Sequence, residues 1–142
     1  MEIKRLVALA LLAMALSSIA VCATTGLQII YIDYANNADE IVVIFNASPL
    51  VLNLTGYRLW SQGDQEFVFG ISELNPQQPV IAAYDVVRIH SGMCTPLSDP
   101  RDFRWQKADG SCYLANVWND SGDIARLFAP GGVTPISEYH YP

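Results

Sequence analysis

Hydrophobic and polar residues alternate with a period of two along much of this chain, which is the spacing that places side chains on opposite faces of a β-strand. Tyr, Val, Ile, Phe and Trp, which favour pleated and half-buried surfaces, are frequent throughout. No apolar stripe with a helical period follows Ala23. The pattern predicts short strands over residues 27–34, 40–46, 51–60, 66–69, 80–83, 86–90, 123–128 and 133–139. Such a series favours an all-β sandwich or barrel, in which the segment 40–46, apolar on both faces, would be central.

The third of these segments changes face part-way along. Leu52 and Leu54 share one parity of the alternation, whereas Tyr57 and Leu59 share the other. One extra residue in a strand turns the following side chains over, and glycine tolerates the backbone that such an insertion needs. We therefore predict that Gly56 occupies a β-bulge that fixes the register of this strand.

Glycine and proline also mark the connections between strands. Gly131 and Gly132 follow Pro130 between the last two segments, which is typical of a hairpin turn where glycine supplies a positive φ. Residues 91–116 form the longest irregular stretch. Loops of this length in a compact domain are usually functional or tied down.

The first residues differ in character from the rest. Lys4 and Arg5 precede an apolar run from Leu6 to Leu16, and small residues follow up to Ala23. This arrangement is typical of a secretory signal peptide, and the run is short for a spanning helix, which needs ~20 residues. We expect residues 1–23 to be a signal helix that is cleaved after Ala23, and residues 24–142 to be the folded domain.

Two other fates of this segment stay open. It could remain attached as an uncleaved anchor, or Cys22 could become the lipidated first residue of a lipoprotein. The lipoprotein interpretation is the weaker one, because Val21 stands where such signals prefer Gly, Ala or Ser. Either fate would tether the domain to a membrane.

Composition narrows the class of protein. The chain has 142 residues, of which 51% are hydrophobic and 15% charged, which suits one globular domain rather than a disordered chain or a coiled coil. Its 8 Lys and Arg against 14 Asp and Glu give a net charge of −6, and loss of residues 1–23 would change this to 6 − 13 = −7. An acidic chain without a basic run is a poor partner for a phosphate backbone, so no nucleic-acid partner is expected.

Export would place the cysteines in an oxidising compartment. Removal of the signal peptide takes Cys22 and leaves Cys94 and Cys112, an even number. We predict a disulfide between them, with two buried free thiols as the alternative. A zinc site is not expected, because the pair lacks C-x-x-C spacing and only His90 and His140 could join it.

The sequence shows no catalytic or cofactor signature. It contains neither G-x-S-x-G nor H-E-x-x-H, and no phosphate-cradling glycine loop. Asp120 and Asp123 flank a glycine and could bind calcium together with Asp99, Asp102 and Asp109, although a turn that starts a strand is the stronger interpretation. We expect no catalytic residue, no cofactor and no metal.

Five further residues are singled out by type. Asn53 and Asn119 begin N-x-S/T triplets, the acceptor pattern for glycosylation, although structural hydrogen bonding is the favoured interpretation. Trp105 and Trp118 are expected to pack in the core or anchor loops. Trp60 precedes a polar turn and is expected to be the more exposed tryptophan.

The order of these motifs resembles that of lamin tail domains. The resemblance rests on a strand ending in Asn (39–46), a Leu-Thr-Gly-Tyr-x-Leu run (54–59), a loop tryptophan (103–105) and a closing strand (117–127). No single motif is specific for this family. The set of motifs in this order is specific, and it covers roughly residues 27–141. The resemblance implies an immunoglobulin-like β-sandwich and, with the signal segment, the exported prokaryotic proteins built on this module rather than a nuclear filament.

These observations favour an exported, non-enzymatic module for binding or scaffolding at the cell surface, with a protein or a surface polymer as its partner. One alternative is an accessory domain or enzyme that acts on surface polymers, since long loops can hold sites. Another is a membrane-tethered structural protein. Membrane contact is expected only through an uncleaved signal segment or a lipidated Cys22. Sandwich folds host many functions, so the fold itself selects none of these.

Overall fold

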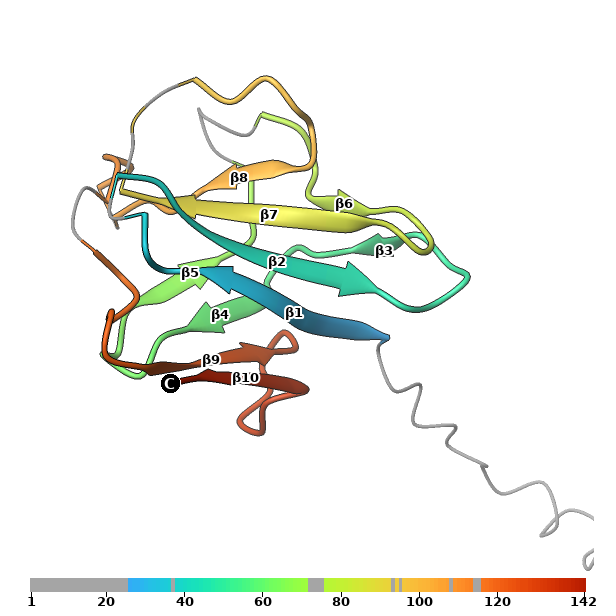
Figure 1. Cartoon of the computed structure of the whole chain (residues 1–142). Helices are drawn as coiled ribbons and strands as arrows, with labels where there is room; N and C mark the ends of the chain where they lie inside the picture. Colours follow the sequence, from blue (N-terminus) through green and yellow to red (C-terminus); the bar gives the residue numbers. More distant parts are fainter. Residues whose placement is uncertain are drawn as a thin grey trace, which may run out of the picture.

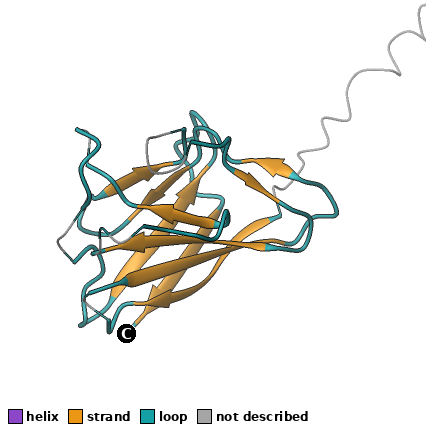
Figure 2. Cartoon of the chain, turned by 90° about the horizontal axis from the view of Figure 1, so that it is seen from above, coloured by secondary structure: helices purple, strands orange, loops and turns teal. Residues whose placement is uncertain are grey.

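The computed structural model describes residues 26–36, 38–71, 76–92, 94, 96–107, 109–113 and 116–142. These residues form an all-β sandwich of the immunoglobulin-like type, and Figure 2 shows strands and loops but no helix among them. The predicted fold class is therefore confirmed. The predicted signal helix lies outside the described residues. Within these ranges, no helix is long and apolar enough to cross a bilayer.

The described strands build two four-stranded sheets and one two-stranded sheet (Figure 1). The strands pair in antiparallel fashion except for β7 and β8, which are parallel. In sheet order, the first sheet is β1 (Leu27–Asp33), β2 (Glu40–Asn46), β7 (Val86–Ser91) and β8 (Asp102–Arg104). The second is β10 (Ser137–Tyr141), β9 (Asp123–Phe128), β4 (Arg58–Trp60) and β5 (Glu66–Val68). The small sheet pairs β3 (Leu52–Asn53) with β6 (Val80–Ile81).

Strand β2 lies between β1 and β7, so its predicted central place is confirmed. Its residues alternate between fully buried and half-buried positions. The apolar members Val42 and Ile44 face the core, and the polar residues Glu40 and Asn46 are buried at the two ends of the strand. Each end therefore carries a polar group that must find hydrogen-bond partners inside the protein.

A chain of aromatic side chains joins the two sheets through the core. Phe69 meets Phe103 edge-on at 5.2 Å, and Phe67 lies 4.8 Å from Phe69 and 5.7 Å from Trp105. Trp105 in turn meets Trp118 edge-on at 6.0 Å. These tilted and edge-on pairs are the arrangements that aromatic rings favour. Trp105 and Trp118 are each 1% exposed, so their predicted packing is confirmed.

Trp60 is only half-buried, as expected for the most exposed tryptophan. Its ring lies 5.5 Å from Phe128 and within 5.7 Å of the Arg58 guanidinium.

One side of the sandwich is closed by β1 and β10. The Ile29 amide donates to the Ser137 hydroxyl at 3.0 Å. At the other end of the same two strands, the rings of Tyr34 and Tyr141 stack with centroids 4.2 Å apart. Because the sheets meet here, β1 is held by both of them.

The prediction of one bulged strand over residues 51–60 is wrong. Two short strands, β3 and β4, occupy this stretch in different sheets. Gly56 lies in the turn between them, where Tyr57 donates to the Leu54 carbonyl at 2.9 Å. A change of sheet reverses the side-chain parity just as a bulge would. The alternation therefore predicted a bulge where the chain passes from one sheet to another. The strand register shifts in β1 instead, between Ile29 and Tyr31.

The positive φ expected at Gly56 is present, at 80°. A Cβ there would lie 3.3 Å from the Pro130 ring. Glycine is therefore required by conformation and crowded by its neighbour, although not by a bulge.

The loop of the terminal hairpin is also longer than predicted. Gly132 donates to the Ala129 carbonyl at 2.9 Å and closes a turn in which Gly131 has a φ of 70°. Proline at the second and glycine at the third position are typical of a type II turn. The chain then continues irregularly, and the final strand begins at Ser137 rather than at residue 133.

The irregular stretch 91–116 contains structure that the alternation did not predict. Strand β8 pairs in parallel with β7, with Ile89 opposite Phe103. Gln106 and Cys112 then form an isolated antiparallel bridge. The expectation that this stretch is irregular is therefore wrong for β8 and for the Gln106–Cys112 bridge.

Candidate functional site

A groove of about 500 Å³ opens beside the outer edge of the first sheet. It is lined by two segments that lie far apart in the sequence, one over residues 76–80 and the other over 97–103. The first contributes Gln77 and Gln78, and the second contributes Asp99, Arg101 and buried Phe103. The groove thus combines an apolar surface with amide, carboxylate and guanidinium groups.

Both walls of the groove are fixed to strands. Leu54 donates to the Pro79 carbonyl at 2.8 Å, and the Asn53 amide lies 3.3 Å from the Gln78 side-chain oxygen, so the first wall is held against β3. On the second wall, Arg88 of β7 donates its backbone N–H to the Arg101 carbonyl at 2.9 Å. A partner would therefore meet a largely formed surface, which lowers the entropy loss on binding.

An ion-pair network surrounds the second wall. Asp99 lies 2.8 Å from Arg101 and 2.9 Å from Arg88. Arg88 also pairs with Asp102, and Arg101 lies 3.4 Å from Asp85. The hydrogen bond from the Arg101 guanidinium is the main reason why the pKa of Asp99 lies well below its ordinary value. The Asp99 carboxylate is consequently a weak proton acceptor.

Behind this network lie two buried basic side chains that sequence reasoning did not connect. His90 places Nδ1 3.0 Å from Asp39 and Nε2 3.6 Å from Asp102. Arg104 is 2% exposed, and its burial lowers its pKa although Asp39 and Asp102 act in the opposite direction. Pairing β7 with β8 brings these residues together, and only the three-dimensional register reveals it.

Glu40 is a buried carboxylate at the opposite end of β2 from Asn46. It accepts hydrogen bonds from the Ser91 hydroxyl at 2.9 Å and the Val117 amide at 2.8 Å. Burial raises its pKa, and these hydrogen bonds only partly offset the effect. Glu40 therefore anchors the segment that carries Trp118 to the first sheet, which is a structural role.

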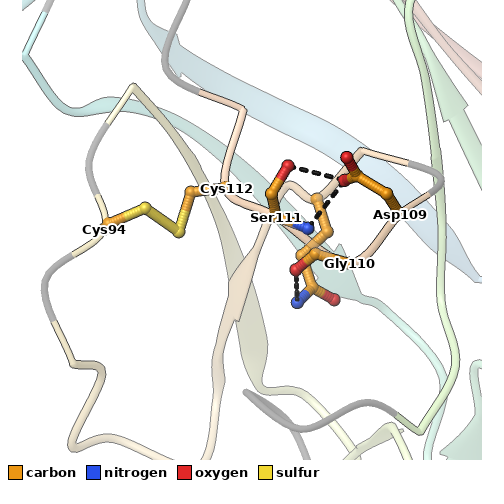
Figure 3. The surroundings of a disulfide bond; sticks show 6 residues. Cys94, Asp109, Gly110, Ser111 and Cys112 are labelled. Carbon is orange, nitrogen blue, oxygen red and sulfur yellow. Dashed lines mark hydrogen bonds between the residues drawn. A yellow bond between two sulfur atoms is a disulfide. The ribbon is translucent and has the colours of Figure 1, made fainter.

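Cys94 and Cys112 form a disulfide with Cα atoms 5.7 Å apart (Figure 3). The bond closes a segment that backbone hydrogen bonds already hold, including Gly92 to Tyr113 at 3.0 Å and Tyr113 to Trp105 at 3.1 Å. Beside it, the Asp109 carboxylate accepts from the Ser111 amide and hydroxyl, as Figure 3 shows. The disulfide thus cross-links the loop that carries Trp105.

Of the acidic residues considered for calcium, Asp99 and Asp102 lie close together, because both contact Arg88. Asp99 and Asp102 pair with arginines, whereas Asp109 caps its own turn. Asp123 is buried and accepts from the backbone amides of Gln62 and Ile124, so the interpretation of a turn that starts a strand fits it. Among the residues with described positions, no group of three His, Cys, Asp or Glu side chains could hold a metal ion.

The asparagine of each glycosylation triplet, Asn53 and Asn119, is exposed. Asn53 accepts from the Thr55 amide at 2.9 Å and contacts Gln78 across the small sheet. Asn119 lies 3.4 Å from Asp123. Both side chains thus take part in local hydrogen bonding.

A family model described as the Lamin Tail Domain matches residues 21–142. The chain belongs to this family. No curated protein that was compared matches it. The lamin tail domain match covers the whole sandwich described above.

The motifs that carried the resemblance now have physical roles in this lamin tail domain. The side-chain amide of Asn46 donates to the Leu50 and Ala82 carbonyls at 2.7 and 2.9 Å, and its oxygen accepts from the Ser48 amide at 3.0 Å. This one side chain ties the loop after β2 to the turn before β7. Gly56 makes the turn that sends the chain from the small sheet to the second sheet.

Sequence reasoning did not find the groove, although it singled out two of the residues that line it, Asp99 and Asp102, as possible calcium ligands. The lining residues lie mostly in irregular segments, and no spacing relates residues 76–80 to 97–103. The only available signal was the Asp99-Pro100-Arg101 triplet, in which a carboxylate and a guanidinium flank a proline closely enough to pair. Their position became evident only when β8 was placed next to β7.

Proposed function

We propose that this lamin tail domain is an exported, non-enzymatic module that binds a protein or a polymer at the cell surface of a prokaryote through the groove. The observation that carries the proposal is the groove itself. Its walls are held by strands and ion pairs, and it presents apolar, amide and charged groups along a volume of about 500 Å³. Such mixed concave surfaces are typical of binding sites.

The proposed location outside the cytoplasm has two supports. The sequence begins with a segment typical of a secretory signal peptide. The structure joins Cys94 to Cys112, and disulfides persist mainly in oxidising compartments. The disulfide is compatible with this location.

The proposed absence of catalysis rests on the state of the groove's carboxylates. A general acid or base works best when its pKa lies near the working pH. The pKa of Asp99 is shifted the other way by Arg101, and Asp102 is engaged by Arg88. These groups are arranged to hold the loop and to present fixed charge, which suits recognition.

Binding through the groove can be tested with matched arginine variants. Purified protein would be applied to arrays of cell-surface oligosaccharides and of peptides from surface proteins. Arg101→Ala removes a groove guanidinium, and Ser98→Tyr places a ring in the groove. Arg126→Ala is the control, because Arg126 also forms an exposed ion pair, with Glu138 on the second sheet.

We expect the wild type and Arg126→Ala to be retained equally and both groove variants to lose retention. Equal retention of all four proteins would place binding elsewhere and overturn the groove assignment. Cleavage of any arrayed polymer would overturn the non-enzymatic part.

Export has its own measurement, which is mass spectrometry of the native N-terminus. Cleavage after Ala23 leaves Thr24 as the first residue, and a lipoprotein would begin with modified Cys22. An unprocessed chain that stays in the cytoplasm would refute the location.

A further inference from the structure

Three large side chains project from one end of the sandwich into solvent. Leu50 and Val51 are each 65% exposed and Tyr84 is 64% exposed. Leu50 and Val51 lie in the loop after β2, and Tyr84 lies in the turn before β7. We call these three residues the apolar tip.

The two parts of the apolar tip form one surface. The Asn46 side chain donates to the carbonyls of both Leu50 and Ala82, so the loop and the turn meet at a single amide. The Asn46 backbone also donates to the Asp85 carbonyl at 2.9 Å. Figure 1 shows the same arrangement, with the end of β2 beside the start of β7. The loop residues 47–51 and the turn residues 82–84 include no charged side chain.

Tyr84 has a backbone that bulky residues rarely adopt. Its φ is 57°, in a turn that Asp85 closes by donating to the Ala82 carbonyl. Glycine or asparagine would take this conformation with less strain. A strained position that carries an exposed aromatic ring points to a use for that ring.

The N-terminal chain enters the domain at this same end. Ala47 donates to the Gly26 carbonyl at 2.8 Å, and a Cβ on Gly26 would lie 2.8 Å from the Ser48 amide nitrogen. Gly26 is therefore packed directly against the loop that bears Leu50. Three residues separate it from Cys22, so the two Cα atoms can be at most about 14 Å apart.

We propose that the apolar tip rests in the interface of a lipid bilayer to which the preceding segment attaches the domain. Any attachment at or before Cys22 brings the tip within reach of that bilayer. The tip has the chemistry of this environment, because aliphatic side chains enter the acyl boundary and tyrosine places its ring there with its hydroxyl in water. The inference rests on the membrane-attached form of the proposed extracytoplasmic module.

The test uses the full chain inserted in phosphatidylcholine vesicles, with and without brominated acyl chains that quench nearby tryptophan. Tyr84→Trp places the reporter in the apolar tip. Gln62→Trp is the control, because Gln62 is exposed beside Asp123, at the end of the sandwich where Tyr34 stacks on Tyr141. The length of β1 puts these ends about 20 Å apart. The three native tryptophans give a constant background that the unsubstituted chain measures.

We expect brominated lipid to reduce the fluorescence of Tyr84→Trp and to leave Gln62→Trp at the level of the unsubstituted chain. Leu50→Trp provides a second reporter that does not alter the Tyr84 turn. No quenching at either tip position, or equal quenching at Gln62, would overturn the proposal. If sedimentation shows that the protein dimerises and the tip reporters are shielded from quenching in the dimer, the apolar tip binds a second copy. That result would also overturn the proposal. Binding by the groove is measured on arrays without lipid, so the two proposals fail separately.

Discussion

Replacing Cys94 and Cys112 by serine is expected to lower the stability of the domain by about 3 kcal/mol. The disulfide closes a loop with a sequence separation of 18 residues, and the chain-entropy relation for a loop of this length gives about 3 kcal/mol at 25 °C. The stabilisation arises mainly in the unfolded state, where the bond restricts the chain. The native loop should keep its shape without the bond, because Lys107 still donates to Ser111 at 2.8 Å and Tyr113 to Trp105.

Thermal unfolding followed by circular dichroism would measure this loss. For a domain of this size, about 3 kcal/mol corresponds to a fall in Tm of about 10 °C. The Cys94→Ser/Cys112→Ser variant should show this fall without reductant. Reductant should lower the Tm of the wild type to a similar value and leave the double variant unchanged.

Two results would refute the reasoning. An equal Tm for the wild type and the double variant under oxidising conditions would show that the bond does not constrain the unfolded chain. Two reactive thiols in the unreduced, denatured wild type would show that the bond is not formed. Loss of the native tryptophan emission in the variant at low temperature would instead mean that the bond maintains the packing of Trp105.

Three further predictions concern single side chains. Gly56→Val should lower the unfolding free energy in urea by more than ~1 kcal/mol, because the residue has a φ of 80°, and an unchanged midpoint would contradict this. Asn46→Ala should cost about 1–3 kcal/mol by leaving the Leu50 and Ala82 carbonyls without their donor, which faster proteolysis of this loop would also report. Burial raises the folded-state pKa of Glu40, so the wild type should lose stability as the pH rises from 4.5 through that pKa, whereas Glu40→Gln should not show this loss in chemical denaturation. A parallel pH dependence in the two proteins would assign the effect to another group.

The strands that the sequence predicted best are the longest ones, with six or seven residues. The bounds of β2 and β9 are as predicted, and β1 and β7 differ by one residue at one end. In each, at least two apolar side chains are buried on the face toward the core. Such segments specify their own register, because a slip of one residue would expose the whole buried face.

Short elements could not be predicted in this way. Strand β8 has three residues, and its segment contains the charged Asp102 and buried Arg104. Alternation over three residues is indistinguishable from chance, and the parallel pairing with β7 depends on contacts made elsewhere. The stretch 51–60 failed for a different reason, since a turn between two sheets and a bulge within one strand produce the same change of parity.

The candidate surfaces were beyond sequence analysis because each joins separate segments. The groove needs residues 76–80 and 97–103 side by side, and the apolar tip needs the loop after β2 beside the turn before β7. Only the family resemblance pointed toward this arrangement, through the asparagine that ends β2. Its hydrogen bonds show why that position matters, since one amide fixes two loops.

The two proposed surfaces are physically connected. Val80 of β6 lines the groove, and Tyr84 of the apolar tip lies in the short β6–β7 connection that follows. Arg101 of the groove also reaches Asp85, the residue that follows Tyr84, at 3.4 Å. If the tip rests on a bilayer, the groove must therefore open close to the membrane surface. A partner that binds there has to reach the layer next to the lipid, which favours membrane-proximal protein segments or polymers anchored in the same membrane over ligands held farther out.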